Sequence, residues 1–83
     1  MDSYVIMCRS VTHAQRGLRL LENMGVRAYM LKVPQSLTAE GCGYGLKLRV
    51  KDPMIYVKEM KSAGLRTGRV FRLDGGEYVE VGL

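Results

Sequence analysis

The stretch YGLKLRVKDP, residues 44–53, predicts a strand followed at once by a helix. Apolar residues alternate with small or charged ones over its first seven positions, which is typical of a strand with one face in solvent. Asp52 then suits a helix N-cap, and Pro53 suits the first helical position because its ring fixes φ and it has no N–H to satisfy. We expect this helix to run from Pro53 to about Ala63, with Gly64 as its stop.

A second amphipathic helix is predicted on the N-terminal side, after the apolar run at residues 4–8 that indicates a central strand. Ser10 and Thr12 are both candidate caps, and Thr12 with Gln15 fits a capping box. Gly25 is the expected stop of this helix. The apolar stripe recurs at spacings of three and four residues, at Ala14, Leu18, Leu21 and Met24.

Further strands are predicted at Val26 to Val33 and at Leu65 to Leu73, and the turn signal at residues 74–76 allows a short extra hairpin strand at Glu77 to Val81. The order strand-helix-strand-strand-helix-strand is that of a ferredoxin-like α+β sandwich. We therefore expect a four-stranded antiparallel sheet with two helices on one face. No repeat or linker interrupts the pattern, so a single domain over residues 1–83 is expected.

Composition restricts the class of protein. A chain of 83 residues that is 47% hydrophobic can form one core, and its two cysteines are too few for a disulfide framework. The first residues resemble a strand rather than a signal peptide, and no apolar run approaches the ~20 residues of a membrane span. We expect a cytoplasmic protein with reduced thiols and no membrane partner.

The net charge is +5, from thirteen Lys and Arg against eight Asp and Glu, which would favour anionic partners. The basic residues are scattered along the chain, without a basic block or an aromatic-rich RNA-binding strand. Nucleic acid is therefore not the expected partner, and the excess is interpreted as a solvated surface.

A cysteine between two glycines is the most unusual feature of the sequence: Gly41-Cys42-Gly43 lies just before the strand at residues 44–50. Glycines permit positive φ and close approach of another molecule to the backbone. In the predicted topology this loop and the start of the first helix share one end of the sheet, and the second helix begins at the other end. The residues expected beside Cys42 are Ser10, Thr12 and His13.

This placement would favour thiolate chemistry. A helix N-terminus has a partial positive charge and unpaired N–H groups, and both lower the pKa of a nearby thiol from its ordinary ~8.5. The backbone amides of Gly41 and Gly43 would add an anion-binding nest. His13 would act there as general base, hydrogen-bond donor or orienting residue.

Each of these residues also has an ordinary structural interpretation. Cys42 can fill a gap beneath a turn, His13 can be a solvated surface residue, and Ser10 and Thr12 can be caps alone. Cys8 lies in an apolar strand and is interpreted as a core residue. No metal site is expected, because Cys8, His13 and Cys42 are only three candidate ligands and form no C-x-x-C pair.

Three motifs resemble one known family: SVTHA at residues 10–14, Pro34 after the second strand, and Gly41-Cys42-Gly43 before the third. The family is the "Putative Se/S carrier protein-like" group of small bacterial domains, and the resemblance extends over roughly residues 4–71. It implies that Cys42 carries sulfur or selenium as a persulfide or selenopersulfide. Arg16-Gly17 and Cys8 depart from the family pattern, and Cys8 introduces the hypothesis of a Cys8–Cys42 exchange.

The leading interpretation is therefore a carrier rather than a conventional enzyme. The Cys42 thiolate would accept sulfur or selenium from a donor such as a cysteine desulfurase and pass it to an acceptor protein. No cofactor is expected apart from the covalently carried atom. The alternative is a non-catalytic ferredoxin-like module that binds a protein, a small anion or RNA. The sequence leaves the oligomeric state and the choice between sulfur and selenium open.

Overall fold

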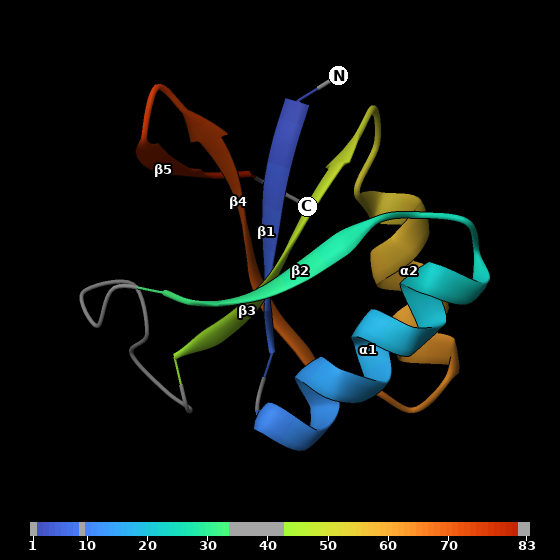
Figure 1. Cartoon of the computed structure of the whole chain (residues 1–83). Helices are drawn as coiled ribbons and strands as arrows, with labels where there is room; N and C mark the ends of the chain where they lie inside the picture. Colours follow the sequence, from blue (N-terminus) through green and yellow to red (C-terminus); the bar gives the residue numbers. More distant parts are fainter. Residues whose placement is uncertain (1, 9, 34–42, 82–83) are drawn as a thin grey trace.

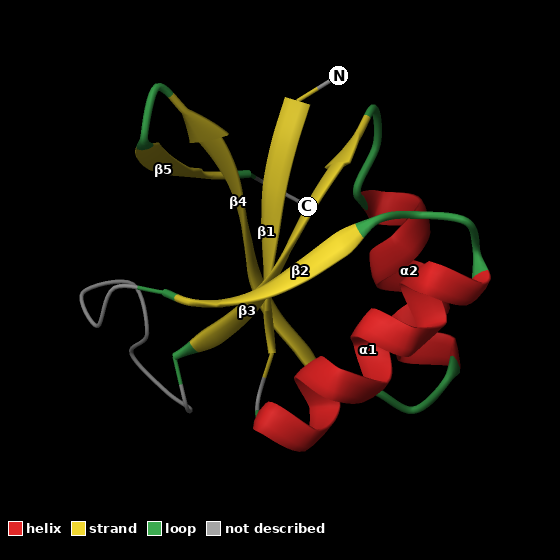
Figure 2. Cartoon of the chain, in the orientation of Figure 1, coloured by secondary structure: helices red, strands yellow, loops and turns green. Residues whose placement is uncertain are grey.

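The computed structural model describes residues 2–8, 10–33 and 43–81 (Figure 1). Within them, five strands form one antiparallel sheet in the order β2-β3-β1-β4-β5, and both helices lie on the same side of it (Figure 2). The extra hairpin strand is present, so the described sheet has one strand more than the predicted four. The elements are β1 (Asp2–Cys8), α1 (Val11–Asn23), β2 (Ala28–Lys32), β3 (Tyr44–Val50), α2 (Met54–Ser62), β4 (Thr67–Asp74) and β5 (Glu77–Glu80).

Strand β1 is the centre of the molecule, because it pairs with β3 on one side and with β4 on the other. Its apolar residues are buried on both faces of the sheet, which explains why the run shows no alternation. Tyr4, Ile6 and Cys8 belong to the core under the helices, whereas Val5 and Met7 belong to a smaller cluster on the opposite face. The predicted central strand is confirmed.

Residues of the β4–β5 hairpin pack against the smaller cluster on the helix-free face. Phe71 and Tyr78 pack edge to face there, with ring centroids 6.0 Å apart and an interplanar angle of 83°. Such aromatic pairs stabilise a fold beyond the area that they bury. The hairpin strand β5 therefore adds apolar contacts to the sheet as well as backbone hydrogen bonds.

Helix α1 packs closely on the sheet because Gly17 has no side chain. A Cβ atom at this position would lie 2.6 Å from Cε of Met60 and 2.8 Å from Cδ1 of Leu46. Gly17 is buried together with Ala14 and Leu21, which confirms the core side of the predicted stripe. The stripe ends earlier than predicted, since Met24 is 38% exposed.

The N-termini of the helices are set by side chains just before them. Ser10 has extended backbone angles, φ −150° and ψ 166°, and its hydroxyl accepts the N–H of His13 at 3.2 Å. Ser10 is thus the cap, and the predicted capping box beginning at Thr12 is wrong, because the chain is already helical at Val11. Before α2, the Asp52 carboxylate accepts the backbone N–H of Met54 at 3.0 Å. The predicted bounds of this helix shift by one residue at each end, because Pro53 is the N-cap rather than the first helical residue and Ala63 is the C-cap, so α2 spans Met54–Ser62.

Both helices end with the same glycine motif, as predicted. Gly25 and Gly64 have φ of 80° and 82°, and the residue after each donates its N–H back to the helix at 2.9 Å. These donors are Val26 and Leu65, which the sequence pattern assigned to strands. Since their N–H groups close the helix ends, β2 and β4 begin two residues later than predicted.

Candidate functional site

The register of the sheet places the start of α1 and the start of β3 at the same end of the molecule. Met7 of β1 pairs with Gly45 of β3, and Asp2 pairs with Val50 at the other end. Helix α1 follows the end of β1, whereas α2 follows the end of β3 and begins at the opposite end of the sheet (Figure 1). This part of the predicted arrangement is confirmed. Gly41 and Cys42 lie outside the described residues.

Gly43, the residue after Cys42 in the chain, is described and has the backbone conformation that favours glycine. Its φ is 74°, and its carbonyl accepts the N–H of Val33 at 2.6 Å. This hydrogen bond joins the end of β2 to the start of β3, and the segment that contains Cys42 connects the same two points along the chain. A side chain at Gly43 would strain the backbone, since non-glycine residues rarely adopt such φ values.

The first turn of α1 presents polar groups at the same end of the sheet. Ser10 caps the helix, and Thr12 is exposed in its first turn. No acidic side chain lies in that turn, so no carboxylate of the turn offsets the partial positive charge of the helix end. The N–H groups of Val11 and Thr12 have no acceptor within the helix, because the first turn of any helix lacks them. These groups suit an anion.

His13 is half-buried and already has a hydrogen-bond partner. Its Nδ1 atom accepts the backbone N–H of Arg66 at 3.1 Å, across 53 residues of sequence. Because Nδ1 is an acceptor, the neutral ring has its proton on Nε2. His13 can therefore donate a hydrogen bond from Nε2 toward a neighbouring group. Of the roles expected for it, those of donor and orienting residue fit this geometry better than that of a base acting through Nδ1.

Arg66 was not predicted as part of this arrangement, and no local signal could have indicated it. Its contribution is a backbone N–H in the connection between α2 and β4. This connection comes next to α1 because α1 packs on β1 and β4 pairs with β1. The contact fixes the ring of His13 relative to the sheet.

Cys8 is a core residue, as interpreted from the sequence. It is 4% exposed, and its Sγ atom donates to the carbonyl of Ile6 at 3.7 Å. It faces Thr67 of β4, next to an irregularity in the β1–β4 register. The exchange between Cys8 and Cys42 stays a hypothesis, since Cys42 is outside the described residues.

Two further findings concern classes of function. Within residues 2–8, 10–33 and 43–81, no group of three or more His, Cys, Asp or Glu side chains is arranged to hold a metal ion. Over the same residues, neither helix is long and apolar enough to cross a membrane.

A family model described as "Putative Se/S carrier protein-like" matches residues 3–72 of the chain. The chain belongs to this family. The match begins in β1 and ends in β4, so it includes both helices and the Gly41-Cys42-Gly43 motif but not β5. The resemblance inferred from the SVTHA and glycine motifs is thereby confirmed. No curated protein and no solved structure matches the chain.

Proposed function

We propose that the chain is a selenium or sulfur carrier in which Cys42 holds the transferred atom. The observation that carries this proposal is the family match over residues 3–72, which contains the Gly41-Cys42-Gly43 motif. The position of Gly43 supports it, because this residue lies at the sheet end where α1 begins. A thiolate near that helix N-terminus would be stabilised by its free N–H groups and partial charge.

The transfer step that we propose is an exchange between a thiolate and a persulfide. The Cys42 thiolate attacks the terminal sulfur of a donor persulfide, R–S–SH, and the S–S bond of the donor breaks. The inner sulfur of the donor leaves as the thiolate R–S⁻, while the terminal sulfur keeps its proton and becomes part of Cys42–S–SH. No net oxidation or reduction occurs, so no further reactant is needed. A selenopersulfide, R–S–SeH, transfers selenium by the same step.

The groups around α1 would then stabilise the loaded form. Loss of the terminal proton leaves an anion, and the first turn of α1 offers it unpaired N–H groups near Ser10 and Thr12. The Nε2–H of His13 is a further donor, since Nδ1 is held by Arg66. The amides of Gly41 and Gly43 complete the proposed binding set, which contains no metal and no separate cofactor.

The proposed partners follow from the carrier role. A donor such as a cysteine desulfurase would supply the persulfide, and an acceptor protein would receive it. We place this exchange in the cytoplasm, where thiols stay reduced. The order β2-β3-β1-β4, with both helices on one face, supports the ferredoxin-like interpretation of this part of the sheet.

One observation favours the alternative, a binding module without thiol chemistry. The hydrogen bond between His13 and Arg66 gives the only histidine of the chain a structural role, so His13 by itself does not indicate catalysis. In that case Cys42 would have no special reactivity. The two functions therefore differ in one measurable property, which is whether Cys42 gains sulfur from a donor.

Mass spectrometry after incubation with a cysteine desulfurase and cysteine tests the proposal. We expect the protein to gain the mass of one sulfur atom on Cys42, and a reductant to remove it. The Cys42→Ser variant should fold and gain nothing, whereas the Cys8→Ala variant should still gain it, because Cys8 is buried in the core. Sulfur found on Cys8, or none acquired from any sulfur or selenium donor, would support the binding module instead.

A further inference from the structure

Strand β2 is an open edge of the described sheet and leads directly into the segment that contains Cys42. Among residues 2–8, 10–33 and 43–81 it pairs with β3 alone, in the order β2-β3-β1-β4-β5. Val33 follows β2 and is hydrogen-bonded to Gly43, the residue after Cys42. An extended chain paired with β2 would therefore run toward the ends of this segment. Unpaired edge backbone is a template for another strand.

The register identifies which backbone groups of β2 face outward. Val33 donates to Gly43 directly opposite it, so this is a hydrogen-bonded pair of the antiparallel ladder. Because such pairs alternate along a ladder, the N–H and C=O groups of Tyr29 and Leu31 point to β3. Those of Met30 and Lys32 then point to the open edge. The outer edge thus offers regularly spaced donors and acceptors.

The side chains of β2 are also exposed on both faces of the sheet. Tyr29 is 64% exposed on the helix-free face, and Met30 is 37% exposed on the helix face. The two ends of the strand are marked by the exposed cations Arg27 and Lys32, and the half-buried Lys47 lies opposite Tyr29. A partner strand would therefore meet apolar side chains in the middle and positive charge at both ends.

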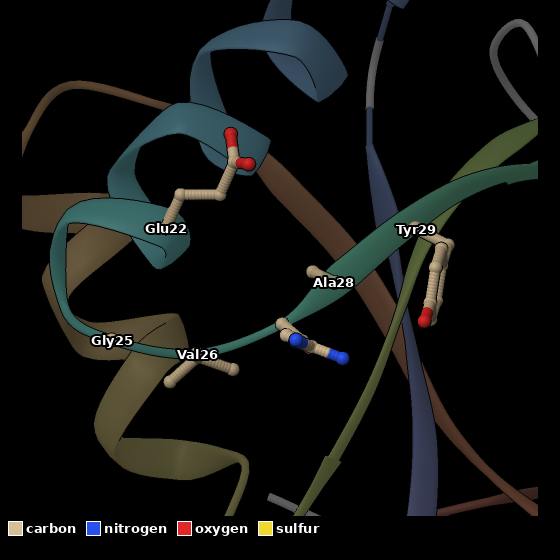
Figure 3. A pocket seen from close by; sticks show the side chains of 6 residues that line it. Glu22, Gly25, Val26, Ala28 and Tyr29 are labelled. Atoms are coloured by element: carbon tan, nitrogen blue, oxygen red, sulfur yellow. The ribbon is translucent and has the colours of Figure 1, made fainter.

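A shallow pocket adds to this edge at the start of β2. It is lined by residues from the end of α1, from the connection that follows it and from the beginning of the strand, as Figure 3 shows. Arg27 and Tyr29 contribute to it, together with one carboxylate, that of Glu22. The pocket widens the contact surface next to the exposed strand.

The charges disfavour a second copy of the chain as the occupant. Each copy has a net charge of +5, so pairing two β2 edges brings like charges together. The edge strand β5 of another copy offers two carboxylates, Glu77 and Glu80, and Glu80 already has an ion-pair partner in its own chain, with 3.8 Å between its Oε2 and Nε of Arg69. A negatively charged segment of a different protein fits the edge better.

We propose that β2 is the docking edge for an extended acidic segment of the protein that supplies or receives the sulfur atom. The inference rests on the proposed carrier function, because it identifies the partner surface of that same site. Main-chain hydrogen bonds to the outward groups of Met30 and Lys32 provide the pairing. Arg27 and Lys32 select negative charge, and Tyr29 and Met30 contact the alternate side chains of the partner.

An NMR titration of the ¹⁵N-labelled Cys42→Ser protein tests this edge without any thiol chemistry. The probe is the peptide Glu-Val-Glu-Val-Glu-Ile-Glu, and its control is the same peptide with Lys in place of Glu. We expect the acidic peptide to shift the amide signals of Met30 and Lys32 and to slow their hydrogen exchange. The basic peptide should produce neither effect.

Two variants and a matched control sharpen the test. Met30→Pro removes one outward N–H and leaves the ladder to β3 intact, so we expect it to raise the Kd of the acidic peptide about fivefold. Glu80→Pro is the control on the opposite edge, where the bond from Val81 to Val70 shows that the N–H of Glu80 also points outward. It should leave the Kd unchanged. Lys32→Glu keeps all backbone donors and should weaken acidic-peptide binding while admitting the basic peptide.

Several outcomes would overturn the proposal. These are equal binding of both peptides, signal shifts confined to other elements, tighter binding of a uridine dodecamer, and a dimer that Met30→Pro dissociates. Failure here is distinguishable from failure of the carrier function. Loading of Cys42 from a small persulfide such as glutathione persulfide needs no docking edge, and peptide binding to the Cys42→Ser protein needs no loading.

Discussion

At the scale of single residues, His13 connects the start of α1 to the segment before β4 through one hydrogen bond from Arg66. The two nitrogens of its ring have different roles in this arrangement. Nδ1 accepts the bond from Arg66 and so contributes to the fold, whereas Nε2–H would be the donor to the bound anion in the proposed carrier. Substitutions that imitate one nitrogen at a time can therefore separate stability from transfer.

The first prediction uses this separation. His13→Asn keeps an acceptor close to the position of Nδ1, so its free energy of unfolding should stay near that of the wild type. His13→Gln places its amide farther out and loses the bond from Arg66, which should cost about 1 kcal/mol. Persulfide loading should be slowed more by Asn than by Gln if Nε2–H assists it. Urea unfolding and loading rates measure the two effects, and equal stability of both variants would show that the bond contributes nothing.

The sequence reveals some of these residues and not others. Ser10 could be predicted as one of two candidate caps, with Thr12, because a hydroxyl residue shortly before an apolar stripe has a local meaning. Only the structure shows that Ser10 is the one used. The partner of His13 could not, because a backbone N–H that lies 53 residues away leaves no mark in the side-chain pattern. The positive φ of Gly43 is an intermediate case: glycine permits it, and only the structure shows that it is used.

At the scale of elements, the contact between α1 and the sheet depends on the missing side chain of Gly17. Helix propensity favours alanine over glycine by up to ~1 kcal/mol, so a surface glycine would gain from the change. At Gly17 the new Cβ would instead lie 2.6 Å from Met60 and 2.8 Å from Leu46. Overpacking of this kind typically costs about 1–3 kcal/mol of stability. This cost is larger than the gain of up to ~1 kcal/mol in helix propensity.

The second prediction is that Gly17→Ala destabilises the protein, by about 1 kcal/mol after the two terms are combined. Thermal unfolding measures the loss. Met60→Val shortens the nearer neighbour, so in the double variant the two losses should be less than additive. Strict additivity would mean that Met60 already moves aside without cost, and a stabilised Gly17→Ala variant would contradict the close packing of α1.

The order of the elements could be predicted from the sequence, whereas the first residues of β2 and β4 could not. Periodicity and punctuating glycines indicated every helix and strand of the described chain. Val26 and Leu65 were assigned to strands because they are apolar, yet their N–H groups close the two helices. A side-chain pattern does not show which carbonyl accepts a given backbone N–H. Because the N–H groups of Val26 and Leu65 bond to the helices, β2 and β4 begin two residues later than expected.

At the scale of the whole molecule, strand order decides which surfaces are open. In the part of the chain that the structure describes, β2 and β5 are the edges of the sheet, and their charges differ in sign: Arg27 and Lys32 flank β2, whereas Glu77 and Glu80 lie on β5. Along the sequence the basic residues are scattered, and this gave no reason to expect a docking site. Arg27 and Lys32 are close together in the sequence, and only the strand order shows that the strand they flank is an edge of the described sheet, with Lys47 of β3 beside it.

The last prediction compares the two thiols of the folded protein. Cys8 is 4% exposed beneath α1, so it should react with iodoacetamide only when the molecule opens, and its rate should rise as urea lowers stability. Cys42, if it is the carrier residue, should react in the native state and faster than a free cysteine at neutral pH, because only the thiolate is nucleophilic. Mass spectrometry of the two cysteine-containing peptides follows both rates in one sample. A Cys42 rate that also depends on urea would mean that this thiol is packed away, and the carrier function would then lose its chemical basis.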